Sequence, residues 1–348
     1  MKHHLFSDSH VGLNFVAIGG GNGLSTLLSG LKRYVHASEI EPVWIEDLSA
    51  IVAVTDDGGS SGRLRDELQM LPPGDIRNCM VALSEDSQLL SQLFQYRFRG
   101  EGQLGGHSFG NLFLAAMTEI TGDFAEAVKL SSEILASKGH IFPATVTDVR
   151  LAAELNDGSI AHGETRISQV GHDIKRLYLE PAGCEPMPET LAAIEAADVI
   201  TVGPGSLFTS LLPPLLVNGV ADAIASSKAT KIFVCNLMTQ PGETDGMTSR
   251  RHLEIVREYA PQLDFDYVIV NNAPVSSEQM AKYSQEGAEQ IGVHGSINTE
   301  TIEGAEIVYG NLLDDGEMVR HHPDKLAQVL FLCALETDPA VQSVSFSL

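Results

Sequence analysis

The sequence predicts a doubly wound α/β fold with a mostly parallel sheet and an inserted antiparallel β-hairpin. Three observations support this prediction. Short apolar strands recur along the chain, glycine-rich turns open helices after them, and one segment alternates polar and apolar residues around an Asn-Asp-Gly turn. No internal repeat or low-complexity linker divides the chain, so we expect residues 1–348 to form a single domain.

The first strand is expected at 13–18, and it leads through the glycine turn 19–23 into a helix at 24–31. A second strand, 49–54, also ends in polar and glycine residues. Helices are expected at 89–98, 112–120, 188–196 and 323–335, a hairpin at about 145–170 with its turn at 156–158, and a further strand at 175–179. Parallel strands are expected again at 198–202, 231–235, 267–270 and 306–308.

The charge balance narrows the class of partner. The chain has 22 Lys and Arg against 46 Asp and Glu, a net charge of −24, which repels nucleic acid and anionic membrane surfaces. The uncharged segment 199–221 is broken by Gly and Pro, so it is not expected to span a membrane. No secretory signal is recognised, and the four widely spaced cysteines are expected to be reduced core thiols, so we expect a cytoplasmic protein.

The turn after the first strand has the composition of a phosphate-binding loop. Glycines let the backbone approach an anion, and the helix that follows offers free N–H groups. Leu24 stands where the dinucleotide fingerprint requires Gly or Ala, which argues against an NAD(P)-dependent oxidoreductase. The candidates for phosphate contact are Gly20, Gly21, Asn22 and Gly23, and the alternative is a purely structural turn.

The segment 55–65 is the most unusual part of the chain, because carboxylates, small residues and arginines follow a strand directly. Asp56 and Asp57 are candidates either for hydrogen bonds to a ribose or base or for ligation of a divalent cation. The other candidates for contact with the ligand are Thr55, Gly59, Ser60, Ser61 and Arg63. The alternative is an Asp-rich turn with a helix N-cap at Ser60 or Ser61.

Further candidates open helices or follow strands. Asp75 fits a helix N-cap, and Arg77 lies in the same first turn, where an anionic partner would compensate its unfavourable position in the helix dipole. His107 is a candidate phosphate donor or general acid, with a capping or core role as the alternative. The remaining candidates are Asn78, Asn111, Gly203, Gly205, Ser206 and Asn236. We expect these residues to line a crevice at the carboxyl ends of the strands.

Five segments carry a resemblance that extends over most of the chain. They are Ile-Gly-Gly-Gly-Asn-Gly at 18–23, Val-Thr-Asp-Asp-Gly-Gly-Ser-Ser-Gly-Arg-Leu-Arg at 54–65, Pro-Gly-Asp-Ile-Arg-Asn at 73–78, His-Ser-Phe-Gly-Asn at 107–111 and Gly-Pro-Gly-Ser-Leu at 203–207. In this order they resemble the gluconeogenesis factor family of bacteria, the YvcK-like relatives of 2-phospho-L-lactate transferase (CofD). The block at 54–65 is the most specific of the five.

The resemblance implies a Rossmann-like core and a role in cell shape during growth on gluconeogenic carbon sources. Together with the apolar stretch 199–217, for which burial in the core is the alternative, it also predicts a homodimer. It also implies a nucleotide sugar such as a UDP-sugar as ligand, and it supplies no catalytic residue. In the transferase branch, the same fold moves a lactyl phosphate from a guanosine diphosphate donor to a deazaflavin with a divalent metal. A CofD-like transferase with Mg²⁺ as cofactor and another nucleotide diphosphate as ligand is therefore the alternative function.

Overall fold

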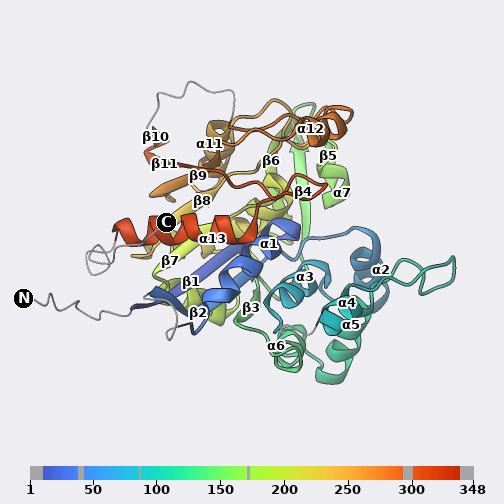
Figure 1. Ribbon diagram of the computed structural model, residues 1–348. Helices are drawn as coiled ribbons and strands as arrows, with labels where there is room; N and C mark the ends of the chain where they lie inside the picture. The colour runs from blue at the N-terminus through green and yellow to red at the C-terminus, as the bar shows by residue number, and fades with distance from the viewer. Residues whose placement is uncertain (1–10, 38–42, 86–87, 171–172, 293–300, 338–348) are drawn as a thin grey trace, which may run out of the picture.

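The computed structural model describes residues 11–37, 43–85, 88–170, 173–292 and 301–337, and its centre is an eight-stranded sheet (Figure 1). In sheet order the strands are β10 (Thr301–Ile302), β11 (Ala305–Gly310), β9 (Tyr267–Asn271), β8 (Thr230–Val234), β7 (Val199–Val202), β1 (Val11–Gly19), β2 (Val43–Val52) and β3 (His140–Pro143). Every neighbouring pair is parallel except β10 with β11. The predicted fold class is confirmed.

Helices cover both faces of the sheet, and the inner strands are accordingly apolar on both sides. Helices α1 (Gly21–Leu31), α3 (Gly74–Leu83) and α13 (Pro323–Thr337) pack together on one face. The other face is covered by α8 (Pro188–Ala196), α9 (Leu212–Leu216), α10 (Val220–Ser226) and α11 (Ser249–Tyr259). The remaining helices are α2 (Gly59–Leu68), α4 (Gln88–Gln95), α5 (Phe109–Thr121), α6 (Phe124–Ile134), α7 (Glu164–Ile167) and α12 (Ser277–Ser284), with a 3₁₀ turn at Lys32–Tyr34 and a π-helical turn at Leu207–Leu211.

The inserted segment is a small antiparallel sheet of β4 (Arg150–Leu155), β5 (Ile160–His162) and β6 (Ile174–Glu180). The predicted hairpin and the added strand are confirmed. The prediction of a strand over 160–170 is wrong beyond His162, because the chain turns there into α7. The Asp57 carboxylate accepts hydrogen bonds from both the N–H and the hydroxyl of Thr165 and so fixes this helical turn.

The apolar stretch 199–217 belongs to β7, the π-helical turn and α9, and most of its side chains are buried in the core. Among the described helices none alone is long and apolar enough to cross a bilayer. One pair, Leu207–Leu216 with Val220–Ser226, passes that test only in combination and is bent by 80°. All four cysteines are free and buried, as predicted.

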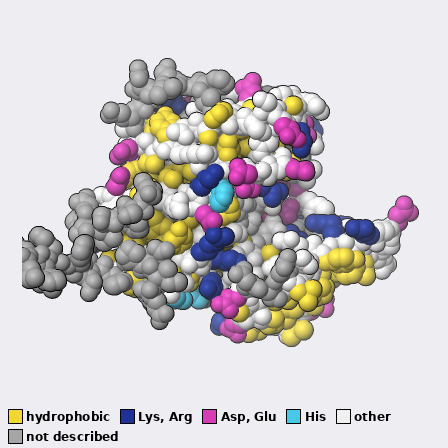
Figure 2. Space-filling model, in the orientation of Figure 1, with side chains coloured by type: hydrophobic (Ala, Val, Ile, Leu, Met, Phe, Trp, Pro, Cys, Tyr) yellow, Lys and Arg dark blue, Asp and Glu magenta, His cyan; other side chains and the backbone are white. Residues whose placement is uncertain are grey.

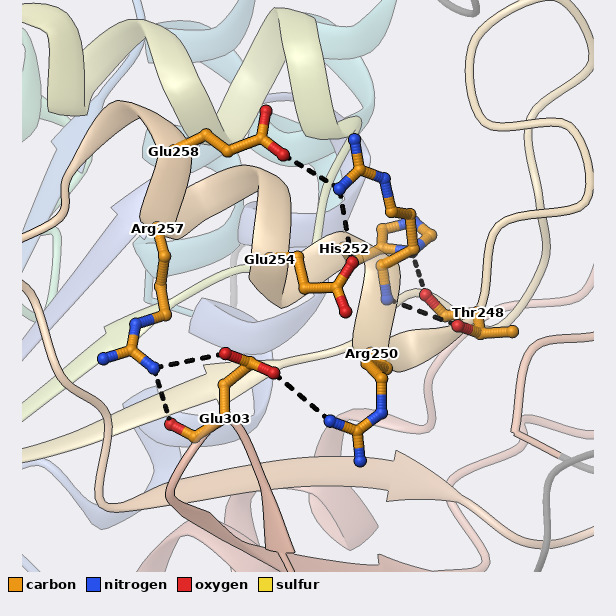
Figure 3. Close-up of polar contacts among 8 residues, drawn as sticks. Thr248, Arg250, His252, Glu254, Arg257, Glu258 and Glu303 are labelled. Atoms are coloured by element: carbon orange, nitrogen blue, oxygen red, sulfur yellow. Dashed lines mark hydrogen bonds and ion pairs between the residues drawn. The ribbon is translucent and has the colours of Figure 1, made fainter.

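An ion-pair network joins α11 to the turn between β10 and β11 (Figure 3). The Glu303 carboxylate accepts hydrogen bonds from Arg250 at 3.2 Å and Arg257 at 3.3 Å, and Arg257 also reaches the Glu303 carbonyl oxygen. Thr248 caps the helix by accepting a hydrogen bond from the N–H of Arg251. These contacts attach the β10–β11 hairpin, at the edge of the sheet, to α11.

Two ion pairs attach the antiparallel insertion to α2. Arg65 is almost completely buried and donates to Asp148 and to the Val149 carbonyl oxygen. Arg150 pairs with Asp66, and both of these side chains are half-exposed or more. Nε and Nη1 of the buried Arg65 have no hydrogen-bond partner in the described chain. Asp148 is therefore the charged group that stabilises the buried guanidinium.

We expect Asp148→Asn to lower the free energy of unfolding by about 1–3 kcal/mol, because the buried Arg65 guanidinium loses its charged partner. Arg150→Met is the matched control and should cost less than about 1 kcal/mol, since its pair is exposed to solvent. Denaturant unfolding of both variants measures the two values. Equal losses would contradict a special structural role for the pair between the buried Arg65 and the half-exposed Asp148.

Candidate functional site

Strands β2 and β3 extend the sheet on one side of β1, and β7 and the later strands extend it on the other side, so the strand order reverses between β1 and β7. A cleft of about 610 Å³ opens beside the carboxyl ends of these two strands. Parallel α/β sheets bind their ligands at this kind of switch point. The cleft is walled by the loops after β1, β7 and β8. The predicted site residues that line it are Gly20, Gly21, Asn22, Gly23, Gly205, Ser206 and Asn236.

The N-terminus of α1 forms one wall of the cleft. Its N-cap residue, Gly20, has an extended backbone and no side chain to satisfy the first N–H groups. Of these groups, the Gly21 N–H bonds to the Asp75 carboxylate. A Cβ on Gly23 would lie 2.3 Å from the Pro204 carbonyl oxygen, so the glycine lets the loops after β1 and β7 meet.

The loop after β7 is held by polar groups of the protein itself. The Gly205 N–H donates to the Asn236 side-chain oxygen at 3.1 Å. Ser206 donates its hydroxyl proton to Glu243 and accepts a hydrogen bond from Thr209, and Glu243 also accepts from the Phe208 N–H. The predicted phosphate donors of this loop are thus already engaged in shaping the cleft wall.

Gly205 is also packed closely. An added Cβ would come within 3.1 Å of Leu211 and 3.2 Å of Ser210. A larger residue there would disturb the loop itself as well as any ligand contact, so the absence of a side chain has a structural reason.

The other predicted residues lie outside the cleft. Gly203 underlies the loop, with Val234 against it. The rest gather around the N-terminal ends of α2, α3 and α5 and comprise Thr55, Asp56, Asp57, Gly59, Ser60, Ser61, Arg63, Asp75, Asn78, His107 and Asn111. The two groups meet at Gly20, where an added Cβ would lie 2.7 Å from an Asp75 carboxylate oxygen. The expected single crevice is therefore a cleft with an adjoining polar cluster.

A chain of buried hydrogen bonds links α2 to α5. The Asn111 amide donates to the Ser60 hydroxyl at 3.1 Å, and that hydroxyl lies 2.9 Å from Nδ1 of His107. Burial, and then the nearby Arg63, lower the pKa of His107, so the ring is neutral at neutral pH. The tautomer of the ring sets which of the Ser60 hydroxyl and His107 Nδ1 donates in this contact. In this arrangement His107 has a structural role: it is buried and contacts Ser60 of α2.

Three arginines, which we call the arginine cluster, surround this chain: Arg63, Arg77 and Arg97. Arg77 is buried, and it donates to Ser108 at 2.7 Å and to Asn78 at 2.6 Å. Its Nε has no partner among the described residues, and burial followed by repulsion from Arg97 lowers its pKa. Such a group of cations in an acidic protein favours an anion as partner.

Carboxylates gather between the cleft and the arginine cluster. Burial, and then Asp56, raise the pKa of Asp75 to about 6. Burial, and then Asp56 and Asp75, raise the pKa of Glu164 to about 9. At neutral pH, Glu164 therefore holds a proton in the free protein, and a bound cation would displace it.

The two predicted metal ligands have different partners. Asp57 bonds to Thr165, whereas one Asp56 oxygen accepts the Gly58 N–H at 2.8 Å. Within the described ranges no three acidic, His or Cys side chains are arranged as a metal cage. The donor type suits Mg²⁺, which takes only one or two carboxylates when phosphate oxygens supply further ligands.

The cleft also contains titratable side chains that were not predicted, among them Glu164, Tyr283, Arg320 and His321. They come from the insertion, from the end of α12 and from the loop before α13, so none follows a strand in the expected pattern. Burial lowers the pKa of His321 to about 4, and the ring bonds to the backbone of Cys235, so it is neutral in the cleft wall. An isolated His or Arg in a loop gives no sequence signal for this position.

Comparison with known proteins agrees with this architecture. The sequence model of the family described as 2-phospho-L-lactate transferase CofD matches residues 15–313. The gluconeogenesis factor of Halalkalibacterium halodurans is 44% identical over 94% of this chain and 99% of its own length. That of Bacillus subtilis is 43% identical over 90% of this chain and 95% of its own.

A solved structure shares the fold at full length. The crystal structure of a Bacillus halodurans protein has a TM-score of 0.84 and 43% sequence identity, covering 92% of this chain and 99% of its own. With a family match over most of the chain and full-length relatives at such identity, the chain belongs to the CofD family, and its relatives within that family are gluconeogenesis factors.

Proposed function

We propose that the protein is a cytoplasmic gluconeogenesis factor that binds a nucleotide sugar, a UDP-sugar, in the cleft between β1, β7 and β8 and acts in cell shape during growth on gluconeogenic carbon sources. The observation that carries the binding proposal is the switch-point cleft with the uncapped N-terminus of α1 in its wall. The part of the proposal that concerns gluconeogenesis rests on the relatives named gluconeogenesis factor, and the role in cell shape rests on the family resemblance of the sequence motifs.

The charges around the cleft explain why a diphosphate would bind with a cation. The N-terminus of α1 and Arg320 favour phosphate, while the nearby carboxylates of Asp56 and Asp75 repel it. Mg²⁺ between phosphate oxygens and these carboxylates would remove that repulsion. Asp56 and Asp75 would hold the ion, and Asp57 could join only by releasing Thr165.

The alternative is a CofD-like transferase that moves a phosphoryl-linked group from a nucleotide diphosphate donor to an acceptor. The family match favours it. Binding a diphosphate and cleaving it use similar donors, so turnover distinguishes the two functions. Incubation with a guanosine diphosphate-linked donor, a deazaflavin and Mg²⁺ that releases GMP would support the transferase, because the transferred group takes one of the donor's two phosphates with it.

We expect UDP-sugars with Mg²⁺ to raise the melting temperature most in a screen that also contains GDP, NAD and a deazaflavin. A ligand at about 100 times its dissociation constant adds about 2.7 kcal/mol to the free energy of unfolding. Omission of Mg²⁺ should reduce the shift. A larger shift with GDP and deazaflavin than with any UDP-sugar would contradict the proposed ligand.

Substitution of Arg63, in the arginine cluster, tests how far the phosphates of the ligand extend from the cleft. If the sugar-linked phosphate reaches past Gly20 to Arg63, we expect Arg63→Ala to weaken UDP-sugar binding roughly tenfold to a hundredfold. Arg63→Lys should recover only part of this loss, because an ammonium lacks the planar fork. Arg33→Ala, at the opposite end of α1, is the control, and calorimetric titration gives the affinities. Unchanged affinity in a folded Arg63→Ala protein would confine the ligand to the cleft.

Glu164 gives a test that needs no ligand. Its carboxyl has an ordinary pKa of 4.5 and a pKa of about 9 in the folded protein. Between these values the folded protein keeps a proton that the unfolded chain releases, so this group makes the free energy of unfolding fall as pH rises. We expect the melting temperature of Glu164→Gln to fall less than that of the parent between about pH 5 and 8.5. Glu195→Gln, an exposed carboxylate on α8, is the control. Identical pH profiles for all three proteins would contradict a protonated Glu164.

A further inference from the structure

A groove of about 510 Å³ lies at the outer edge of the main sheet. Strand β3 ends the sheet on this side, and among the described strands it pairs only with β2. Ile141 and Phe142 of β3 line the groove, α6 forms one wall, and Met187 and Glu189 at the start of α8 form the other. The described residues that line it all differ from those of the cleft at β1 and β7, so this site does not depend on the proposed function.

The outer edge of β3 leaves backbone groups unpaired. The Ala144 N–H donates to the Val52 carbonyl of β2 at 2.9 Å, so alternate residues of β3 face β2. Ile141 directs its N–H and C=O the other way, and neither has a hydrogen-bond partner on that side within the described ranges. Pro143 faces the same way but lacks an N–H, and its carbonyl accepts from the Thr190 hydroxyl at 3.4 Å. Ile141 is therefore the residue at which a further strand can pair.

Acidic side chains predominate around the groove. The titratable residues that line it are Asp123, Glu126, Lys129, Glu133, His140 and Glu189. Both of its basic members already face a carboxylate. Lys129 lies 4.0 Å from Glu126, and His140 lies 3.3 Å from Asp47 of β2. The groove therefore carries an excess of negative charge.

Two carboxylates of the groove are left for a partner. Asp123 is occupied, because it caps α6 by accepting the Glu126 N–H. Glu133, in the last turn of α6, and Glu189, in the first turn of α8, are exposed and have no ion pair in the part of the chain that is described. One therefore stands on each wall. At Glu133 a cation is favoured twice, by the carboxylate and by the negative end of the helix dipole.

The floor between the two walls is apolar. Ile141 is only 6% exposed, and Phe142 and Met187 are partly exposed. The His140 ring stacks on Phe142 at a centroid distance of 6.0 Å and an interplanar angle of 13°. Figure 2 shows Asp and Glu side chains beside hydrophobic ones on the surface over α6. A partner with both cationic and apolar side chains therefore fits the groove better than a simple ion.

We propose that this groove binds an extended segment of another protein that carries at least two Lys or Arg residues. The backbone of the segment pairs with the free N–H and C=O of Ile141, as a strand added to the edge of β3. Its cationic side chains pair with Glu133 and Glu189, and an apolar side chain covers Phe142. Because Pro143 limits the backbone pairing to Ile141, the charges supply much of the affinity, and salt weakens it.

The charge pattern selects this partner over others. A net charge of −24 attracts a basic protein and repels nucleic acid and anionic membranes. A second copy of the chain carries the same net charge, which opposes its approach to an acidic surface. A metal ion or a polyamine would neutralise the carboxylates, but it would leave the Ile141 backbone groups and the apolar floor without a partner.

The first test selects the sequence of the partner segment. Random peptides displayed on phage are selected on the full-length protein, and the recovered peptides are expected to be rich in Lys and Arg. One of them is then synthesised and titrated by fluorescence anisotropy. Glu133→Lys and Glu189→Lys should each weaken its binding roughly tenfold, and about 0.5 M NaCl should do the same. Glu195→Lys is the matched control, since Glu195 is exposed and lies one residue before the end of α8, as Glu133 does in α6.

Circular dichroism confirms that the variants are folded. A Lys in the last turn of a helix is favoured by the helix dipole, so Glu133→Lys should not lower the melting temperature. Recovery of no peptide, recovery of peptides without basic residues, or equal affinity of Glu133→Lys and the parent for the selected peptide would overturn the proposal.

The second test separates an added strand from other occupants. Hydrogen exchange at the Ile141 amide should slow when the selected peptide binds, because that N–H gains a hydrogen bond. Spermidine, a simple cation, should leave this exchange unchanged. Unchanged exchange with the bound peptide would exclude strand addition. A lower mass for Glu133→Lys than for the parent in sedimentation equilibrium would assign the groove to a second copy. Either result would overturn the proposal.

Discussion

The complete enclosure of β1 is the constraint on which the rest of the structure depends. This strand pairs in parallel with β2 on one edge and β7 on the other, and helices cover both faces. The chain must therefore leave the carboxyl ends of β1 and β7 towards different helices, and their loops separate. The cleft follows from this separation, while the contact of Gly23 with Pro204 keeps the two loops close at its base.

Electrostatic compensation is the second constraint. A net charge of −24 leaves few cations for an anionic ligand, yet Arg63, Arg77 and Arg97 lie close together. Burial and then Arg97 lower the pKa of Arg77, and burial and then Arg63 lower the pKa of His107. Burial, and then neighbouring carboxylates, raise the pKa of Asp75 and Glu164. The free protein thus holds groups of both signs in unfavourable ionisation states, and a bound phosphate with its cation would relieve both.

Local pattern was sufficient to predict much of the fold. The apolar runs of β1, β7, β8, β9 and β11 and the helices α8 and α13, which start at Pro, were all found, because burial on both faces and a Pro at the first helical position leave clear signals. Strand β3 was missed because its four residues start at an exposed His and end at Pro, whereas the equally short β7 is apolar and buried throughout. The strand predicted over 160–170 ends at His162, because Asp57, 108 positions earlier in the sequence, holds Thr165 in a helical turn. A contact between residues so far apart leaves no pattern in the local sequence.

The candidate site shows the same division between local and distant causes. Residues that follow strands, such as Asn22 and Asn236, were found because parallel strands place their carboxyl ends together. The roles of several of these residues were not predicted correctly. The Gly205 N–H and the Ser206 hydroxyl form hydrogen bonds to other groups of the protein and do not point freely into the cleft. Glu164 and His321 come from the insertion and the C-terminal loop, where only the tertiary fold makes them neighbours. A glycine- and serine-rich motif in this protein therefore marks where loops pack closely, and the groups left to meet a ligand are those that this packing leaves unpaired.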